Sequence, residues 1–305
     1  AILTRKSAPM SIDYQTTRRS VELSHGTLNY HEAGSGPHLL MIHGSGPGVS
    51  GWANFSGNLA WFSRRFRCLV VDLPGYGGSQ PLAGDPIAGA VKACLEFLDA
   101  VGAPSAHVLG NSLGGMVGSH IAAAHPERVR SLTCIGGIGL NLFAPFPAEG
   151  VNLLTAFAEA PSRERLEAWL RSMGYDQTLI TPELIDTRWE QAMEPNTLAA
   201  TRQIYSRESI GQIAAMREQH PTRAIEHLAT IQAPTLLTWG RDDRVTPLDA
   251  ALLPMRLIPL CELHTFPRCG HWAMIECKQA FETLVMSFLC RDEPGGPDVT
   301  FPERR

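Results

Sequence analysis

The sequence predicts an α/β protein with a mostly parallel, twisted sheet that carries helices on both faces. Short apolar runs alternate with segments of helical spacing, which is typical of buried strands linked by helices. A long helical stretch at 141–228 interrupts this alternation and is predicted to be an insertion. The chain has 305 residues, of which 44% are hydrophobic, so it can bury the core that such a fold needs.

The first half of the chain contains most of the predicted strands. Residues 1–20 are polar and are expected to be peripheral, and Thr27–Ala33 alternates in the manner of an edge strand. The apolar runs that follow are separated by a glycine-rich loop, by the turn Leu73-Pro74-Gly75 and by segments of helical spacing. In chain order, these runs and helices are His38–Ile42, Cys68–Asp72, a helix at 86–101, Ala106–Leu109, a helix at 112–125 and Val129–Ile135.

The strand pattern returns after the helical insertion. The predicted elements there are a strand at 233–239, a helix near 248–256, a strand at 261–266 and a helix near 274–290. The Pro/Gly-rich tail after Arg291 is expected to be mobile. The predicted organisation is therefore a core made of 1–140 and 229–305, with the insertion 141–228 between its halves.

Composition narrows the classes of function. Charged residues make up 18% of the chain and the net charge is −4, so we expect no nucleic-acid surface and no polybasic membrane anchor. No apolar run has the length of a signal peptide or a membrane span. The cysteine count of seven is odd and includes no C-x-x-C pair, which indicates reduced thiols in the cytoplasm. Cys269-Gly270-His271 is too tight for a standard zinc pair, so no metal site is expected.

One serine lies at a predicted strand-to-helix turn. Gly110-Asn111-Ser112-Leu113-Gly114 matches G-x-S-x-G, the pattern of a nucleophile elbow, in which a strained serine is lifted above the sheet beside a helix N-terminus. The alternative is a structural turn in which Ser112 caps the helix. The strand before Ser112 and the helix after it favour the catalytic interpretation.

A second glycine motif offers a rival function. The stretch from Gly46 to Gly51 matches the G-x-G-x-x-G dinucleotide fingerprint, and Asp72 ends the next strand at a suitable distance. Pro47, however, lacks the N–H group that a phosphate cradle would use. The preceding Gly44 instead belongs to a turn that can direct a backbone N–H toward Ser112. No organic cofactor is therefore predicted.

A serine nucleophile needs a base and an orienting acid, and later strands supply both in the order Ser, acid, His. The strand at 261–266 leads to His271, which can act first as general base and then as general acid. The strand at 233–239 leads to Asp242 and Asp243. The loop pattern Gly-x-x-Asp selects Asp243, whereas Asp242 is expected to be solvated or paired with a neighbouring arginine.

With these motifs placed, the chain resembles the meta-cleavage product hydrolases, α/β-hydrolases that break a carbon–carbon bond in ring-opened catechols. The resemblance covers about residues 25–290. The serine elbow and "GRDD" occur widely in the α/β-hydrolase fold, whereas the stretch at 43–55 and the two stretches in the helical insertion, at 141–150 and 179–190, are more specific to this family. The matching stretches are "HGSGPGVSGWANF" at 43–55, "DLPGYGGS" at 72–79, "GNSLGG" at 110–115, "NLFAPFPAEG" at 141–150, "LITPELIDTRWE" at 179–190, "WGRDDRVTPLD" at 239–249 and "CGHW" at 269–272.

The resemblance implies the α/β-hydrolase fold with a helical lid inserted after the sixth strand, and it assigns roles to named residues. Ser112, Asp243 and His271 are implied as the catalytic triad, and the backbone N–H groups of Ser45 and Leu113 as the oxyanion hole. Ser45 and Val245 depart from the residues most frequent in the family, Gly and Phe. The implied substrate-binding residues are Gly44, Gly46, Asn54, Asn111, Arg188 and Trp272.

Arg188 also stands out from the residues alone. Thr181 is a plausible N-cap and Pro182 suits the first helical position, which places Leu184, Arg188 and Ala192 on one face. A cation on such an apolar face is costly unless it meets an anion. The functional interpretation is a clamp on a substrate carboxylate, and the alternative is an arginine whose head reaches a nearby Glu or Asp.

The implied reaction is hydrolysis of a 2-hydroxy-6-oxohexa-2,4-dienoate to 2-hydroxypenta-2,4-dienoate and a carboxylic acid. The attacking group is either Ser112 itself or a water that it activates, and no cofactor is needed. The alternatives are a general carboxylesterase, a cofactor-free dioxygenase and a ligand receptor on the same fold. The expected partners are the small dienoate and further copies of the chain, as a dimer or a larger assembly. The sequence leaves the group on C6 open: alkyl, aryl or steroid-like.

Overall fold

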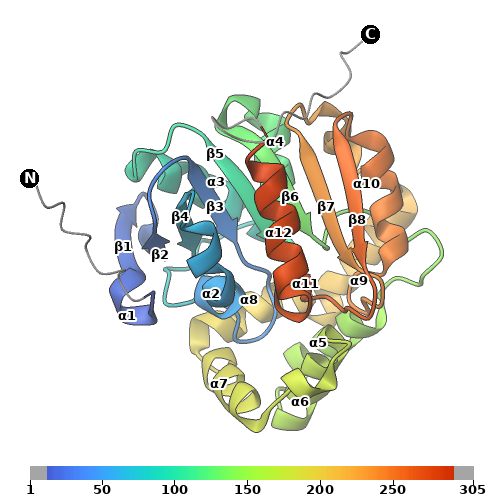
Figure 1. The fold of residues 1–305 in the computed structure, drawn as a ribbon. Coiled ribbons are helices and arrows are strands. Elements are labelled where there is room, and N and C mark those ends of the chain that lie inside the picture. The colour runs from blue at the N-terminus through green and yellow to red at the C-terminus, as the bar shows by residue number, and fades with distance from the viewer. Residues whose placement is uncertain (1–11, 292–305) are drawn as a thin grey trace, which may run out of the picture.

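The centre of the fold is an eight-stranded sheet in the computed structural model, which describes residues 12–291 (Figure 1). Strands β1 and β2, and likewise β2 and β4, pair antiparallel, and every other neighbouring pair is parallel. The predicted mostly parallel sheet is therefore confirmed. In spatial order the strands are β1 (Arg18–Leu23), β2 (Gly26–Ala33), β4 (Arg67–Val71), β3 (His38–Ile42), β5 (Ala106–Asn111), β6 (Val129–Ile135), β7 (Thr235–Gly240) and β8 (Cys261–Phe266).

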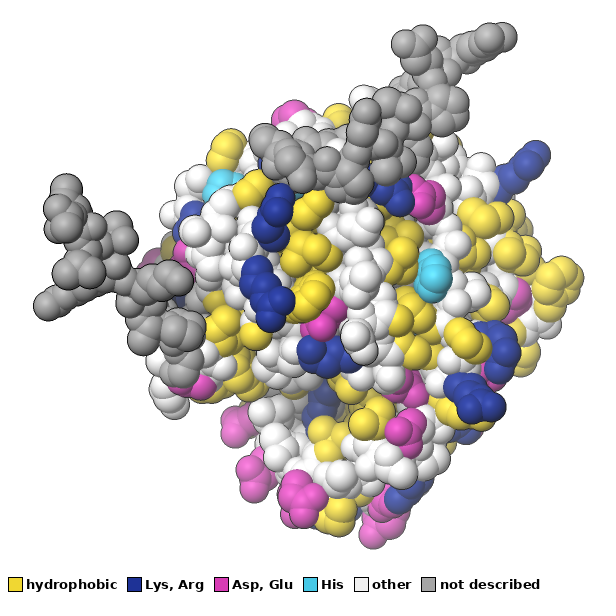
Figure 2. Space-filling model, in the orientation of Figure 1, with side chains coloured by type: hydrophobic (Ala, Val, Ile, Leu, Met, Phe, Trp, Pro, Cys, Tyr) yellow, Lys and Arg dark blue, Asp and Glu magenta, His cyan; other side chains and the backbone are white. Residues whose placement is uncertain are grey.

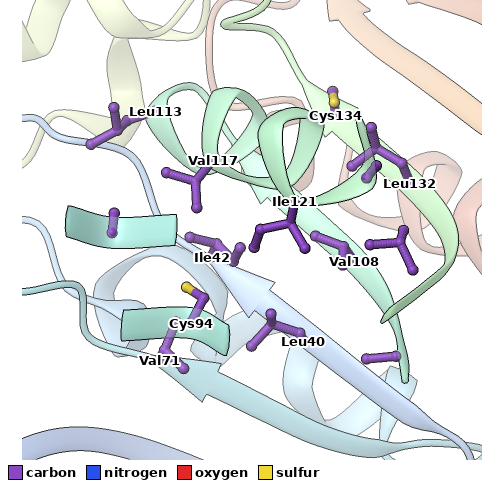
Figure 3. Close-up of a cluster of buried hydrophobic side chains, with 14 of the residues drawn as sticks. Leu40, Ile42, Val71, Cys94, Val108, Leu113, Val117, Ile121, Leu132 and Cys134 are labelled. Atoms are coloured by element: carbon purple, nitrogen blue, oxygen red, sulfur yellow. The ribbon is translucent and has the colours of Figure 1, made fainter. Parts of the chain in front are cut away.

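Helices cover both faces of the sheet and enclose two apolar clusters. On one face, α3 (Pro86–Ala100) and α4 (Leu113–Ala124) pack over the central strands, where Val117 and Ile121 meet Leu40 and Val108 (Figure 3). The other face is covered by α2 (Gly51–Phe62) and α12 (Lys278–Leu289). Because the central strands are apolar on both sides, they read in the sequence as continuous runs.

The chain between β6 and β7 adds helices to the described structure and no strand. These helices lie together beyond one end of the sheet, below it in Figure 1. They contribute apolar side chains, including Leu154, Phe157 and Leu166, to the same cluster as α2 and α12, so they are anchored to the core. They are α5 (Glu149–Glu159), α6 (Arg163–Met173), α7 (Pro182–Ala192), α8 (Pro195–Tyr205) and α9 (Arg207–Gln219), with the 3₁₀ helix η2 (Gln177–Leu179). The 3₁₀ helix η3 (Glu226–Thr230), which leads into β7, packs against α4 instead.

One expectation about the first part of the chain was wrong, and the helix α2 was not predicted. Thr27–Ala33 corresponds to β2, which is not an edge strand, because β1 pairs along its outer side. The glycine-rich loop after β3 ends at Ser50, whose side chain caps α2 by accepting the N–H of Ala53. The polar sequence of β1 and the glycines ahead of α2 hide both elements, since each is stabilised by contacts made elsewhere in the chain. The short helix α1 (Tyr14–Thr17) precedes β1.

The helices near the C-terminus are more broken than expected. The segment 248–256 forms the 3₁₀ helix η4 (Leu248–Ala251) followed by α10 (Leu252–Leu257), and 274–290 divides into α11 (Ala273–Glu276) and α12. One further 3₁₀ helix, η1 (Pro126–Arg128), precedes β6. The tail after Arg291 and the first eleven residues lie outside the described residues.

The surface and helices of the described chain bear on its possible partners. Within residues 12–291, no helix is both long enough and apolar enough to span a membrane. On the face that Figure 2 presents, Lys and Arg side chains are interspersed with Asp and Glu rather than gathered into one broad patch. All seven cysteines are free thiols.

Candidate active site

Ser112 occupies a strained backbone position between β5 and α4. Its φ of +53° lies in the region that side-chain-bearing residues rarely adopt. Ser112 stands at the N-cap position of α4, yet its side chain makes no capping hydrogen bond. The structural alternative, in which Ser112 serves as a helix cap, therefore has no support in this geometry.

The glycines around Ser112 permit this turn because no Cβ fits at their positions. A Cβ on Gly110 would lie 2.2 Å from the carbonyl oxygen of Gly114, and one on Gly114 would lie 2.1 Å from that of Ile42. Gly137, after β6, would bring a Cβ within 2.3 Å of the Cα of Ser112. The two glycines of G-x-S-x-G are thus required by close backbone packing.

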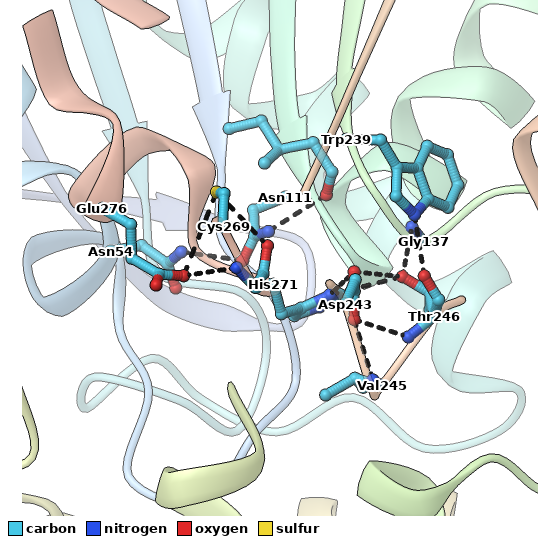
Figure 4. A network of polar contacts seen from close by, with 12 residues as sticks. Asn54, Asn111, Gly137, Trp239, Asp243, Val245, Thr246, Cys269, His271 and Glu276 are labelled. Atoms are coloured by element: carbon cyan, nitrogen blue, oxygen red, sulfur yellow. Dashed lines mark hydrogen bonds and ion pairs between the residues drawn. The ribbon is translucent and has the colours of Figure 1, made fainter. Parts of the chain in front are cut away.

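His271 and Asp243 form a buried pair at the ends of the neighbouring strands. Nδ1 of His271 lies 2.7 Å from Oδ2 of Asp243, and both side chains are 1% exposed (Figure 4). An ionised carboxylate only accepts hydrogen bonds, so Nδ1 carries the proton and Nε2 is left as the basic nitrogen. The pair has the arrangement of a general base and its orienting acid.

The carboxylate of Asp243 is held by its own loop. Its Oδ1 accepts the N–H groups of Val245 at 2.8 Å and Thr246 at 2.9 Å, and its Oδ2 accepts the Thr246 hydroxyl at 2.9 Å. Asp242 lies instead beside Arg241 at 3.4 Å, as expected for the residue not chosen. The loop thus fixes the orientation of Asp243, which in turn fixes the imidazole of His271.

Ser112 and His271 line the same small cavity. Within residues 12–291 their side chains make no hydrogen bond to each other, and such contacts often tighten only when substrate binds.

The N–H groups of Ser45 and Leu113 have no backbone acceptor in the described chain, so both are free to bind an anion. The Leu113 side chain points away from this cavity, into the cluster of Figure 3.

Every predicted substrate-binding residue lines this cavity. Asn54 donates to Oδ1 of Asn111 at 2.9 Å, and Asn111 donates to the carbonyl of Ile135 at 3.1 Å, so the amides are fixed in orientation. The lining residues are Gly44, Ser45, Gly46, Val49, Asn54, Asn111, Ser112, Leu154, Trp169, Met173, Arg188, Tyr205, Val245, His271 and Trp272.

Arg188 is the unusual residue of this cavity. It lies on α7, whose predicted N-cap Thr181 accepts the N–H of Leu184, and it is only 4% exposed. Nη1 of Arg188 is buried without a hydrogen-bond partner in the described chain, where no carboxylate pairs with it either. Burial lowers the pKa of Arg188 to about 10, so the side chain stays charged at neutral pH. Its guanidinium carbon lies 5.8 Å from the ring centre of Trp272.

The dinucleotide alternative does not fit the loop that suggested it. A Cβ on Gly46 would lie 2.3 Å from the ring of Trp169, so that ring occupies the space beside the loop. The first N–H group of α2, from Gly51, already donates to the carboxylate of Asp72 at 2.7 Å. The helix N-terminus thus faces an acidic side chain of the protein rather than an open phosphate cradle.

Sequence reasoning missed the residues that the helical insertion brings to the site. Leu154, Trp169, Met173 and Tyr205 line the cavity, but they follow ordinary helical spacing and carry no motif. Glu276 was missed as well. Its carboxylate accepts N–H groups from Gly270, beside His271, and from Tyr175 and Asp176 of the insertion.

Comparisons with known proteins agree with this geometry. A family model described as the alpha/beta hydrolase fold matches residues 37–277. The chain is 36% identical over 275 residues to 2-hydroxy-6-oxo-6-phenylhexa-2,4-dienoate hydrolase of Burkholderia cepacia, covering 88% of this chain and 92% of that protein. It is 38% identical over 271 residues to 2-hydroxy-6-oxononadienedioate/2-hydroxy-6-oxononatrienedioate hydrolase 2 of Pseudomonas putida, covering 86% and 91%.

The chain belongs to the meta-cleavage product hydrolase family of α/β-hydrolases. Among solved structures, a mutant meta-cleavage product hydrolase of Pseudomonas fluorescens, complexed with acetates, superposes with a TM-score of 0.80. That protein is 29% identical, and the match covers 90% of this chain and 98% of the other. For a meta-cleavage product hydrolase, the cation that shares the cavity of Ser112 and has no carboxylate partner among the described residues becomes the feature to explain.

Proposed function

We propose that the chain hydrolyses the bond between C5 and C6 of a 2-hydroxy-6-oxohexa-2,4-dienoate, giving 2-hydroxypenta-2,4-dienoate and a carboxylic acid. Ser112, His271 and Asp243 are proposed as the catalytic triad. Ser45 and Leu113 supply the oxyanion hole, and Gly44, Gly46, Asn54, Asn111, Arg188 and Trp272 surround the substrate. The activity follows that named for the relatives.

The observation that carries this proposal is the buried guanidinium of Arg188 in the cavity of Ser112, whose Nη1 has no hydrogen-bond partner within residues 12–291. A simple esterase has no need of a cation there, and leaving one unpaired in an apolar site is costly. A dienoate substrate has a carboxylate at one end and its reacting carbonyl at the other. Binding the carboxylate to Arg188 would pair the cation and place C6 toward Ser112.

Cleavage of a carbon–carbon bond first requires a place for the bonding electrons. In the dienol form of the substrate, no carbonyl is positioned to accept electrons from C5. Transfer of a proton from the 2-hydroxyl to C5 creates a 2-oxo group, and this carbonyl then serves as the electron acceptor. His271 assists the transfer as acid and base, while Arg188 and Asn111 hold the carboxylate and the 2-oxo group.

Attack at C6 then completes the reaction. Ser112, or a water that it activates, adds to the C6 carbonyl while His271 takes up its proton. The oxygen at C6 becomes negatively charged and is stabilised by the N–H groups of Ser45 and Leu113, each worth about 3 kcal/mol. When the bond breaks, its electrons move to the 2-oxo oxygen and form the dienolate. If Ser112 is the nucleophile, water then releases the acid from the acyl-enzyme.

The proposal also covers the lid, the cellular location and the oligomeric state of the enzyme. Residues 141–228 act as a lid over the core formed by 1–140 and 229–305, because their side chains wall one side of the cavity. We place the enzyme in the cytoplasm, in keeping with its seven free thiols, and assign it a homo-oligomeric state. Cell fractionation and light scattering coupled to gel filtration test these two assignments.

The deciding experiment follows the visible absorbance of the dienoate across a panel of ring-fission products. We expect wild-type enzyme to bleach at least one substrate that bears an alkyl or aryl group on C6, and we expect Ser112→Ala to lose this activity. p-Nitrophenyl esters and an oxygen electrode run in parallel. Rapid ester hydrolysis with no dienoate consumed would favour a carboxylesterase, and oxygen uptake would favour a dioxygenase. Binding of a dienoate without turnover would favour a receptor.

A further inference from the structure

Tyr205 joins the helical insertion to the loop that carries the proposed oxyanion hole. It is the last residue of α8, and its hydroxyl oxygen lies 2.6 Å from Oγ of Ser45. Both residues line the cavity together with Ser112. The backbone of Ser45 is also held, because Tyr76 donates its hydroxyl to the Ser45 carbonyl at 3.3 Å.

The two hydroxyl groups together carry one more hydrogen than the hydrogen bond between them uses. Ser45 and Tyr205 each contribute one hydroxyl hydrogen, and only one of these can lie between the two oxygens. The burial of Tyr205 raises the pKa of its hydroxyl, so the group keeps its hydrogen at neutral pH. Whichever oxygen donates, one O–H group remains free, and in the described chain neither oxygen has a second hydrogen-bond partner. The mutual hydrogen bond therefore fixes the two oxygens relative to each other and uses only one of their two hydrogens.

The surroundings make this pair unusual for its position. The part of the wall contributed by Val49, Leu154 and Met173 is apolar, and a hydroxyl placed there must be paired to avoid a desolvation cost. The hydrogen bond between Ser45 and Tyr205 removes that desolvation cost, but it would do so at any buried position and does not explain why the pair lies in the cavity of Ser112. The location matters because the N–H of Ser45 belongs to the same residue whose side chain Tyr205 holds.

We propose that Tyr205 is a positioning residue: its hydroxyl fixes the side chain of Ser45 and with it the direction of the donors that Ser45 presents to the reacting carbonyl. This inference rests on the proposed function. It makes α8 part of the oxyanion-hole assembly, so the proposed lid contributes to chemistry and not only to the shape of the cavity. Tyr205 acts through Ser45 and needs no contact of its own with the substrate.

A double-mutant cycle tests this coupling. The variants are Tyr205→Phe, Ser45→Ala and the two combined, with Tyr175→Phe as the control because Tyr175 is 49% exposed. We measure kcat and KM for the dienoate, and the thermal unfolding midpoint of each variant. We expect Tyr205→Phe to lower kcat about tenfold, the worth of one hydrogen bond, with KM changed less than about twofold. The double variant should be no slower than Ser45→Ala alone.

Two results would overturn the inference. Wild-type kcat in Tyr205→Phe, with or without a lower unfolding midpoint, would mean that the pair is only structural. Multiplicative losses in the double variant would mean that Tyr205 acts independently of Ser45. The wild-type enzyme tests the proposed function separately: if it consumes no dienoate, the cycle is run on p-nitrophenyl acetate, whose hydrolysis also needs the oxyanion hole, with the same expected ratios.

Discussion

Replacing Arg188 with methionine should make the protein more stable and the enzyme much less active. Arg188→Met removes a charged group whose Nη1 has no hydrogen-bond partner in the described chain and keeps an unbranched, flexible side chain up to the position of Nε. In most cores the loss of a buried polar contact lowers both stability and function. Here the two should change in opposite directions, because the proposed partner of Arg188 is the carboxylate of the substrate.

The stability change can be estimated from the cost of burying the charge. Burial lowers the pKa of Arg188 to about 10, which corresponds to a penalty of roughly 3 kcal/mol for the charged form. Methionine loses the contact of the guanidinium with Trp272, so part of this gain is offset. We expect the free energy of unfolding to rise by about 1–3 kcal/mol.

The activity change follows from the lost carboxylate contact. Removing one member of a buried, hydrogen-bonded charge pair costs about 2–5 kcal/mol, so kcat/KM for the dienoate should fall roughly 30- to 5,000-fold. Hydrolysis of p-nitrophenyl acetate, which has no carboxylate to bind, should change little. A small carboxylate such as acetate should raise the unfolding temperature of the wild type but not that of Arg188→Met.

Urea unfolding and absorbance kinetics measure both effects. The matched control is Arg171→Met, because Arg171 lies on neighbouring α6 with a half-exposed side chain paired to Glu167. That variant should change stability by less than about 1 kcal/mol and leave kcat/KM unchanged. Two results would contradict an unpaired cation that binds the substrate carboxylate. One is an Arg188→Met variant that is less stable than the wild type, and the other is an equal loss of ester hydrolysis and dienoate hydrolysis.

Three further predictions follow from the packing and charge of the core. Gly114→Ala should destabilise the fold in a thermal unfolding assay, although alanine has the better helix propensity, because its Cβ would lie 2.1 Å from the carbonyl oxygen of Ile42. Its control is Gly211→Ala, where no atom lies within 4 Å of the added Cβ, and this variant should be up to about 1 kcal/mol more stable than the wild type. Thr246→Val, which removes a 2.9 Å hydrogen bond to Asp243, should lower kcat about tenfold, and an unchanged kcat refutes this. Burial raises the pKa of the Asp72 carboxyl from 3.8 to about 7. The stability that protonated Asp72 contributes is therefore present below about pH 4 and is lost as the pH rises through 7. Over this range the unfolding free energy of the wild type minus that of Asp72→Asn should fall, and a flat difference would contradict the shift.

The proposed triad could be predicted because each of its members follows a strand with a recognisable local pattern. Parallel strands direct their carboxyl ends to one edge of the sheet, so residues after β5, β7 and β8 are brought together once the strands are placed. The choice of Asp243 over Asp242 also came from a local loop pattern, and the 2.7 Å contact with His271 agrees with it.

Elements stabilised mainly by distant contacts were harder to predict. The sequence of β1 is polar because one side faces solvent, and it becomes a strand through pairing with β2. The helix α2 follows glycines whose roles depend on neighbours far along the chain, such as Trp169 beside Gly46. Propensity cannot detect either element, since tertiary contacts decide both.

By itself, the sequence predicted the parallel strands of the core in their order along the chain, the elbow at Ser112, and His271 and Asp243 as the candidate base and acid. Only the tertiary structure decided that β3 lies between β4 and β5, that Arg188 has no protein partner in the described chain, and that Tyr205 reaches Ser45. The physical reason is the range of the interactions. Turns and periodicity are set by neighbours in the chain, whereas the pairing of buried polar groups depends on which surfaces meet in the fold.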